Sequence, residues 1–135
     1  MTRRNISSGS PWEPVVGFSR AVRVGDRVLV AGTIANMPGG GDPPPDAYGQ
    51  ARRCLEIIGE ALAEADADFA DVVRTRMYLV PGTDFDEVAR AHGEAFAEVR
   101  PASTALYVTA FVDPRFVVEI EAEAVVPPKR GKVQP

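Results

Sequence analysis

Two short strings in the last third of the chain decide the fold: Arg100–Thr104 (RPAST) and Val118–Ala124 (VEIEAEA). In the second string apolar and charged residues alternate with a period of two. That period places one set of side chains on each face of a β-strand and does not fit a helix. Three glutamates then share one face: Glu119, Glu121 and Glu123. The pattern predicts a strand over 116–126, preceded by a strand over 103–112 and a turn between them.

The residues before this region predict two helices. After Pro45, apolar residues recur at helical spacing. They are Tyr48, Ala51, Leu55, Ile58 and Leu62. Asp46 is the expected N-cap of this helix, because its carboxylate can accept from the first free N–H groups. Asp84, with Glu87 three residues later, resembles a capping box and starts the second helix, which Pro101 ends.

Short β-rich runs fill the rest of the chain. Residues 18–35 hold two runs split by Gly25-Asp26, which predicts a hairpin because glycine supplies the positive φ of a tight turn. Residues 72–80 form a third run. The glycines and prolines within 36–45 predict a loop, and no Lys-Ser/Thr pair follows them as a phosphate-binding loop would require.

The resulting order is β-β-α-β-α-β-β within a single domain over 1–135. An irregular N-terminal segment is expected over 1–16 and a flexible tail over 127–135. Two helices and about five strands predict an α+β fold with both helices on one face of a mixed sheet. The other face mixes apolar and charged residues, so we expect a closed oligomer to cover it. Counting layers does not choose between dimer and trimer.

Composition narrows the class of protein. The net charge of −4 disfavours nucleic-acid binding, which depends on neutralising phosphates. Cys54 is the only cysteine, so it forms no intramolecular disulfide, suits a reducing cytoplasm and is expected to be buried and inert. The chain has no apolar run of membrane-spanning length, so we expect a cytoplasmic protein without a membrane partner. With one cysteine and one histidine, a zinc site of the usual kind is not expected.

Four strings in the right order resemble the RidA (YjgF) family, over roughly residues 15–126. They are GFSRA at 17–21, VAGT at 30–33, GEAF at 93–96, and RPA at 100–102 followed by EIEA at 119–122. The resemblance implies a chorismate-mutase-like fold and a homotrimer with ligand-binding clefts between subunits. It also implies hydrolysis of reactive enamines and imines to a 2-oxo acid and ammonia, without metal or organic cofactor.

The same resemblance assigns roles to single positions. Glu119 falls at the glutamate that positions the attacking water, and Gly32 and Ala102 fall where backbone groups line the cleft. Four positions differ in type from the cleft residues they match. They are Phe18 for a tyrosine, Ala89 for an asparagine, Ala105 for a cysteine and Ser103 for a carboxylate-binding arginine. A hydroxyl does not replace a bidentate guanidinium, so the resemblance is to a branch that lacks this arginine.

Several candidates have a second interpretation. Glu119 is either an acid/base whose pKa is raised by burial or a solvated strand residue. Arg76 could supply the cation that position 103 lacks or form a cross-strand pair with a glutamate, which we favour. Ser103 and Thr104 could bind a polar ligand or simply start a strand. His92 is a candidate base or a residue at a helix boundary.

These features predict a trimeric RidA-like protein that hydrolytically deaminates a small imine, enamine or related carbonyl compound. Glu119 would position water, and Ser103, Thr104 or Arg76 would orient the substrate. Simple 2-imino acids are expected to be poor substrates because the arginine is missing. The alternative is a non-catalytic small-ligand binder or stress-linked interaction protein on the same fold. A ribonuclease is disfavoured by the acidic balance and the single histidine.

Overall fold

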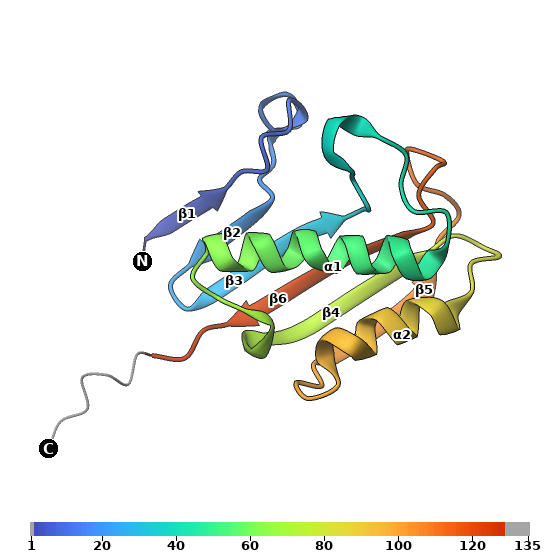
Figure 1. Ribbon diagram of the computed structural model, residues 1–135. Coiled ribbons are helices and arrows are strands. Elements are labelled where there is room, and N and C mark those ends of the chain that lie inside the picture. Colours follow the sequence, from blue (N-terminus) through green and yellow to red (C-terminus); the bar gives the residue numbers. More distant parts are fainter. Residues whose placement is uncertain (1, 129–135) are drawn as a thin grey trace, which may run out of the picture.

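The computed structural model describes residues 2–128. Its strands form one six-stranded sheet, and two helices, α1 (Ala47–Glu64) and α2 (Phe85–Phe96), lie side by side across one face (Figure 1). The strands are β1 (Arg3–Ile6), β2 (Ala21–Val24), β3 (Arg27–Thr33), β4 (Val72–Leu79), β5 (Ala102–Tyr107) and β6 (Val118–Val125). Three short helical turns are η1 (Glu13–Gly17), η2 (Pro38–Gly40) and η3 (Phe69–Asp71).

The order across the sheet is β1-β2-β3-β6-β4-β5. Every pairing is antiparallel except that of β4 with β5, which is parallel. β4 and β5 are joined through α2, as a parallel pair requires a crossover. The prediction of an α+β fold with both helices on one face of a mixed sheet is confirmed.

β6 occupies the middle of the sheet, and its alternation is the one predicted. The apolar residues of β6 face the helices and are at most 2% exposed: Val118, Ile120, Ala122 and Ala124. The glutamates between them point to the opposite face and are half-buried. Burying four apolar side chains of one strand under α1 and its neighbours fixes the register, because a one-residue slip would bury the glutamates instead.

Both helices begin at the predicted caps. The Asp46 side chain accepts from the Gly49 N–H at 2.8 Å, and that of Asp84 accepts from the Asp86 N–H at 2.9 Å. The predicted capping box between Asp84 and Glu87 was wrong. The Glu87 carboxylate instead accepts from the Tyr48 N–H at 3.1 Å, because the first turn of α1 has free N–H groups beside it.

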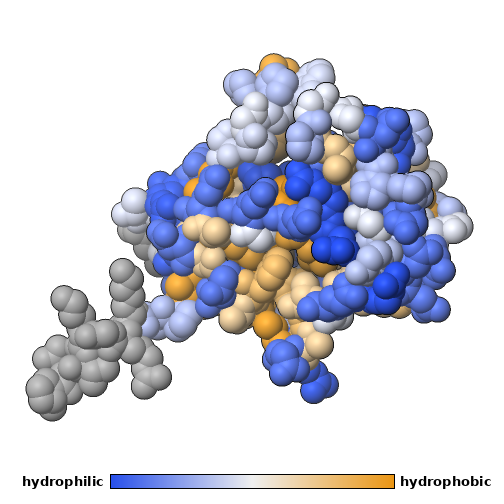
Figure 2. All heavy atoms as spheres, viewed as in Figure 1, coloured by the Kyte–Doolittle hydropathy of each residue, from blue (hydrophilic) through white to orange (hydrophobic). Residues whose placement is uncertain are grey.

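The helices bury one side each and leave the other to solvent. Leu55, Ile58 and Leu62 of α1 lie in the core, together with Val88 and Phe96 of α2. Hydrophilic side chains gather over α1 on the outer surface of this face (Figure 2). The core therefore lies in one layer between sheet and helices.

The N-terminal segment is more ordered than expected. Residues 3–6 form β1, which pairs antiparallel with β2, where an irregular segment was predicted over 1–16. Arg4 then reaches Asp66 at 2.9 Å. The string RRNI has no strand pattern of its own, so its conformation follows from pairing with β2. Residues 127–128 have no regular structure, and the rest of the predicted tail lies outside the described residues.

β5 ends at Tyr107, five residues earlier than predicted. Its partner β4 ends at Leu79, before Pro81 and Gly82, so β5 has no strand to pair with beyond that point. The apolar composition of 108–112 suggested a longer strand, but strand length is set by the neighbour.

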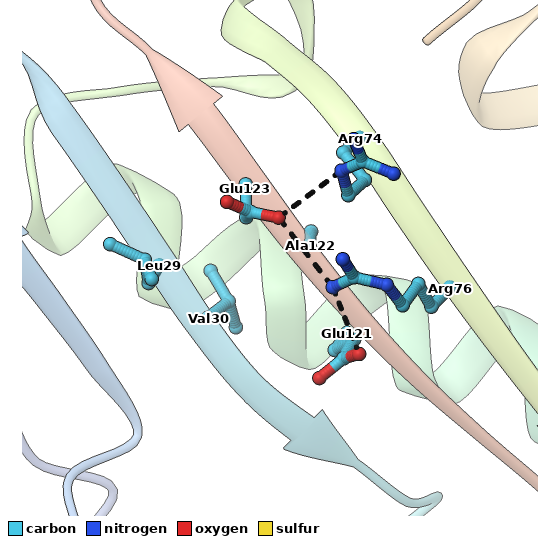
Figure 3. Close-up of a pocket in the computed structure, with 7 residues that line it drawn as sticks. All are labelled: Leu29, Val30, Arg74, Arg76, Glu121, Ala122 and Glu123. Carbon is cyan, nitrogen blue, oxygen red and sulfur yellow. Dashed lines mark hydrogen bonds and ion pairs between the residues drawn. The ribbon is translucent and has the colours of Figure 1, made fainter. Parts of the chain in front are cut away.

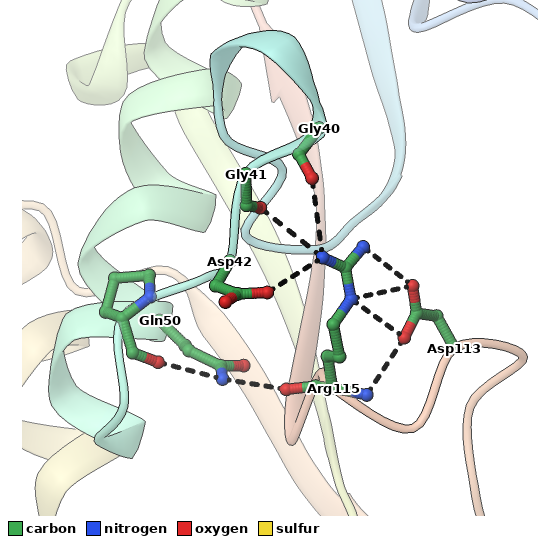
Figure 4. A network of polar contacts seen from close by, with 7 residues as sticks. Gly40, Gly41, Asp42, Gln50, Asp113 and Arg115 are labelled. Carbon is green, nitrogen blue, oxygen red and sulfur yellow. Dashed lines mark hydrogen bonds and ion pairs between the residues drawn. The ribbon is translucent and has the colours of Figure 1, made fainter.

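Polar contacts hold the loops at the start of β6. Arg115 binds Asp113 at 2.9 Å and Asp42 at 3.4 Å, and it also donates to the carbonyl oxygens of Gly40 and Gly41 (Figure 4). Gln50 of α1 donates to the Arg115 carbonyl oxygen at 3.1 Å and accepts from the Val117 N–H at 2.9 Å. These contacts tie the loops and α1 to Arg115 and Val117, four and two positions before Glu119.

Candidate functional site

Glu119 lies over the backbone of Gly32, on the face of the sheet that the helices leave open. The ladder between β3 and β6 has an irregularity between Val30 and Thr33, and Gly32 falls within it. A Cβ at position 32 would collide with the Glu119 carboxylate, so the absence of a side chain makes room for it. The structure thus brings together two of the predicted site residues.

The Glu119 carboxylate is half-buried, and burial raises its pKa. The Arg20 guanidinium opposes this shift, and the Glu121 carboxylate adds to it. A raised pKa brings a carboxylate nearer to the range where it can exchange protons at working pH. Half-burial and a raised pKa meet the condition of the acid/base interpretation, and the role of Glu119 stays a prediction.

Arg20 is a residue that sequence reasoning missed. It is nine-tenths buried, and its Nη2 donates to the carbonyl oxygens of Ala31 at 2.7 Å and Gly32 at 2.5 Å. Its Nε is buried without a hydrogen-bond partner among residues 2–128. Arginine is mostly exposed in proteins, so nothing in the local string marked it as buried. It holds the irregular turn of β3 that faces Glu119.

Charged pairs cover the middle of the open face. Arg76 contacts Glu121 at 3.3 Å and Glu123 at 3.5 Å, and Arg74 contacts Glu123 at 3.4 Å (Figure 3). The Tyr78 hydroxyl donates to Glu121 at 2.6 Å, which raises the pKa of Tyr78. The cross-strand interpretation of Arg76 agrees with this geometry. A shallow cavity of about 300 Å³ lies among these side chains and Leu29.

Ser103 lies in a different place from Glu119. It pairs with Thr75, whereas Glu119 pairs with Tyr78, three residues further along β4. Side chains alternate along a strand, so Ser103 and Glu119 point to opposite faces of the sheet. Thr75 Oγ1 lies 2.8 Å from Ser103 Oγ and 2.8 Å from His92 Nε2. His92 is half-buried, and burial lowers its pKa.

The remaining predicted site residues are spread over three elements. On β5, Ala102 and Thr104 pair with Arg74 and Arg76, and Ala105 pairs with Met77, so Thr104 shares the open face and Ala105 the helix side. Ala89 is half-buried on α2, and Phe18 is 39% exposed just after η1. In residues 2–128, no hydrogen bond joins Phe18 or Ala89 to Glu119.

Cys54 is buried in α1, as predicted. Burial raises the pKa of its thiol, and Sγ donates to the Val118 carbonyl oxygen at 3.9 Å. A thiol that resists ionisation is a poor nucleophile. Among residues 2–128, His, Cys, Asp and Glu side chains form no group of three or more that could hold a metal ion. In the same range, neither helix has the length and apolar character needed to cross a membrane.

Residues 9–126 match the family model described as Endoribonuclease L-PSP. The chain belongs to this family. An uncharacterized protein of Streptomyces coelicolor is 46% identical over 125 residues, 90% of each chain. A 2-iminobutanoate/2-iminopropanoate deaminase of Rattus norvegicus is 32% identical over 124 residues, 91% of this chain and 90% of that one.

A solved structure gives the same result. Rv2704 of Mycobacterium tuberculosis, a member of the YjgF/YER057c/UK114 family, superposes with a TM-score of 0.84 at 43% identity. The match covers 93% of this chain and 100% of Rv2704. The resemblance to the RidA (YjgF) family and its chorismate-mutase-like fold is confirmed. Within residues 2–128 of this L-PSP family chain, predicted site residues take part in the Glu119–Gly32 pair and in the Ser103–Thr75–His92 cluster.

Proposed function

We propose that this protein hydrolytically deaminates a small imine, enamine or related carbonyl compound at clefts between the subunits of a homotrimer. The observation that carries the proposal is Glu119, a half-buried carboxylate with a raised pKa lying over the backbone of Gly32. Relatives named as 2-iminobutanoate/2-iminopropanoate deaminases, 30–33% identical over nine-tenths of the chain, favour the same chemistry.

The chemistry needs a base and little else. The Glu119 carboxylate takes a proton from water while the oxygen attacks the carbon of a C=N bond. The protonated carboxyl then gives that proton to the nitrogen of the resulting amino alcohol. When the starting C=N nitrogen is protonated, the C–N bond then breaks, ammonia leaves, and the hydroxyl oxygen becomes a carbonyl as its proton passes to a second base or to solvent. A carboxylate with a raised pKa suits both transfers, because it accepts and releases the proton with similar ease.

The placement of the candidate residues supports a cleft between subunits. Ser103 and Glu119 point to opposite faces of the sheet, so one chain does not bring them to the same ligand. β5 is exposed along its whole length and includes Leu106 and Tyr107, which are 45% and 57% exposed. An edge strand of this kind is normally covered. A second copy that covers β5 could bring its own Glu119 or Ser103 to the shared cleft.

The substrate is proposed to differ from simple 2-imino acids. Family resemblance places a carboxylate-binding arginine where this chain has Ser103. Losing a charge-assisted hydrogen bond costs roughly 1.5–3 kcal/mol, or about ten- to over a hundredfold in binding. Arg76, the other candidate for binding a carboxylate, is already paired with Glu121 and Glu123. A neutral or differently charged imine is therefore the better fit.

The deciding experiment measures ammonia and 2-oxo-acid release from freshly generated 2-aminoacrylate, and carbonyl release from uncharged imines. Wild type, Glu119→Gln and Ser103→Arg are compared at equal concentration. We expect wild type to prefer the uncharged imines, Glu119→Gln to lose at least roughly a hundredfold, and Ser103→Arg to gain activity on the 2-imino acid. Full activity of Glu119→Gln on every substrate would refute the proposed role.

The oligomer is tested separately by light scattering on the purified chain. A mass of three chains is expected, and Leu106→Asp on the exposed edge strand should reduce it. If wild type is monomeric at micromolar concentration, the shared cleft is refuted. The proposed role of Glu119 in catalysis is not tested by this result.

A non-catalytic binder remains the second candidate. It is favoured by the mismatches at Phe18, Ala89 and Ser103 with the cleft residues that the family resemblance implies. For this candidate, a small carbonyl ligand would raise the melting temperature of wild type with no release of ammonia. A ribonuclease, which the family's name mentions, is disfavoured by the net charge of −4.

A further inference from the structure

A chain of three polar side chains runs from the surface of β5 into the protein. The Ser103 hydroxyl, the Thr75 hydroxyl and the His92 ring are joined by two contacts of 2.8 Å each, both centred on Thr75 Oγ1. They come from three elements, β5, β4 and α2, so the fold brings them together rather than the local sequence. Distances of 2.8 Å are those of well-formed hydrogen bonds.

The three side chains of this hydrogen-bonded row differ in their exposure to solvent. Ser103 belongs to an exposed strand, Thr75 is 1% exposed, and His92 is half-buried with its ring 4.7 Å from that of Phe96. A buried hydroxyl is costly unless it is hydrogen-bonded, and both contacts of Thr75 go to groups that can exchange protons. Thr75 is therefore placed to pass a proton between a half-buried base and the hydroxyl of an exposed residue.

The surroundings of His92 favour its neutral form. Burial lowers its pKa, and no charged group among residues 2–128 opposes that shift. The polar group that contacts it from β4 is the uncharged hydroxyl of Thr75, which in turn contacts the hydroxyl of Ser103 on β5. On its own helix, Arg90 stacks on the Tyr48 ring at 3.6 Å and Glu94 accepts from the Tyr48 hydroxyl at 2.7 Å. Neutral imidazole accepts a proton at Nε2 when Nδ1 carries the hydrogen.

We propose that Ser103, Thr75 and His92 form a proton relay that takes a proton from a substrate hydroxyl held at Ser103. This rests on the proposed deamination. In the resting structure the Thr75 hydroxyl donates to Ser103 Oγ. For the transfer it rotates to donate to His92 Nε2, and the Ser103 hydroxyl rotates to donate to Thr75 Oγ1. As ammonia leaves the amino alcohol, its hydroxyl proton passes to Ser103 Oγ, the Ser103 proton to Thr75 Oγ1, and the Thr75 proton to His92 Nε2. The C–N bond breaks, the C=O bond forms, and an iminium substrate plus water becomes carbonyl, ammonia and a protonated His92. His92 then returns its proton to solvent.

Ser103 is the group that touches substrate, and Thr75 and His92 act through it. The relay gives position 103 a use that differs from binding a carboxylate, since a hydroxyl in a polarised chain can accept a proton where an arginine cannot. It also gives Thr75 and His92 roles that their places in the sequence do not suggest.

The first test does not depend on turnover. His92 is the only histidine, so its ring signals in a nitrogen-15 NMR titration are unambiguous. We expect both Thr75→Val and Ser103→Ala to change the pKa and tautomer balance of His92, and Thr75→Ser to restore the wild-type values. Thr33→Val is the matched control. Thr33 is also buried in the sheet, but its hydroxyl donates to the Ala31 carbonyl oxygen, so His92 should titrate as in wild type.

The second test uses the pH dependence of turnover on an imine that carries no carboxylate and reacts in its protonated, iminium form. Wild type should lose rate as pH falls through the pKa of His92 measured by NMR, because protonated His92 cannot accept a proton. Thr75→Val should lower kcat by roughly ten- to a hundredfold and remove that limb of the profile, with KM little changed. A merely structural Thr75 would lower kcat without moving the profile.

The outcomes separate the relay from the proposed function. If wild type does not turn over any imine, the proposed function fails and the NMR titration alone decides whether the three groups are coupled. If Ser103→Ala leaves His92 with its wild-type pKa and tautomer, the relay is overturned. It is equally overturned if Thr75→Val is active with an unchanged pH profile.

Discussion

The two faces of β6 are made by the same eight residues and behave differently. On the face toward the helices, the apolar residues are buried in the core: Val118, Ile120, Ala122 and Ala124. Toward the open side, Glu119, Glu121 and Glu123 remain half-buried among arginines and Tyr78. The helix face supplies stability through apolar burial, and the open face holds charges in defined places. A half-buried charge can have its pKa adjusted by its neighbours, which a fully solvated one cannot.

The largest effect should come from the helix face. Ile120→Ala removes a fully buried side chain and leaves a cavity beneath the helices. We expect a loss of about 2–5 kcal/mol in the free energy of unfolding, measured by urea denaturation. Glu123→Ala on the opposite face of the same strand is the control and should cost less than about 1 kcal/mol. Similar losses for the two variants would contradict the division between the faces.

A smaller effect is expected where the open face depends on a missing side chain. Gly32→Ala places a methyl group against the Glu119 carboxylate, which must move. We expect a loss of roughly 1 kcal/mol in stability, at the low end for overpacking because the displaced atoms end a flexible side chain. The pKa of Glu119, followed by carbon-13 NMR, should fall as the carboxylate moves toward water.

Gly93→Ala is the matched control for Gly32→Ala. It lies in α2 with open space around its Cβ position, and alanine there should stabilise the chain by about 0.5–1 kcal/mol. A neutral result at Gly32 beside a gain at Gly93 would show that Glu119 does not need the space.

The charged pairs of the open face should contribute less. Glu121→Gln removes the partner of Arg76 and the acceptor of the Tyr78 hydroxyl. We expect a loss of about 0.2–1 kcal/mol, because partly exposed pairs gain little in water. The pKa of Tyr78 should fall toward its ordinary value, which ultraviolet titration of tyrosinate would detect. A pKa that does not move would mean that the hydrogen bond is absent in solution.

The smallest expected effect is a change in stability with pH. Burial lowers the pKa of folded His92 below its usual value of 6.5, so the unfolded chain binds more protons in the window between the two. Stability from this group is complete above about pH 6.5 and is lost as pH falls through the lower, folded pKa. His92→Gln should remove this part of the decline.

Comparing wild type with His92→Gln in urea at several pH values isolates the histidine. Glu119 acts in the opposite direction, because its pKa is raised in the folded state and its contribution is lost as pH rises. That contribution is common to both proteins and cancels in the difference. Parallel pH curves for the two would show that His92 is not buried as a neutral ring.

Sequence patterns were sufficient for the elements whose periodicity is set locally. The alternation of β6, the apolar stripe of α1 and the caps at Asp46 and Asp84 all predicted what is observed. Prediction failed where a neighbouring strand determines whether a strand forms and where it ends. β1 has no strand pattern and forms because β2 offers an unpaired edge, and β5 stops where β4 stops.

The candidate site divides in the same way. Glu119 and Gly32 were chosen from a family resemblance, and the structure places one over the other. Arg20 and Thr75 were not chosen. Both are buried, but polar residues of these types are mostly exposed, and the local sequence does not distinguish the buried ones. Tertiary contact alone identifies them.

The sequence by itself determined the α+β class, the order of the elements and which residues of β6 face the core, because hydrophobic periodicity is a property of neighbouring residues. Only the tertiary structure decided that Glu119 is half-buried over Gly32 and that Arg20 donates to the carbonyl oxygens of Ala31 and Gly32. It also decided that Ser103, Thr75 and His92 are in contact. Those contacts join residues as far apart in the chain as Gly32 and Glu119. Their geometry, burial and pKa shifts arise from packing between elements, which no local pattern encodes.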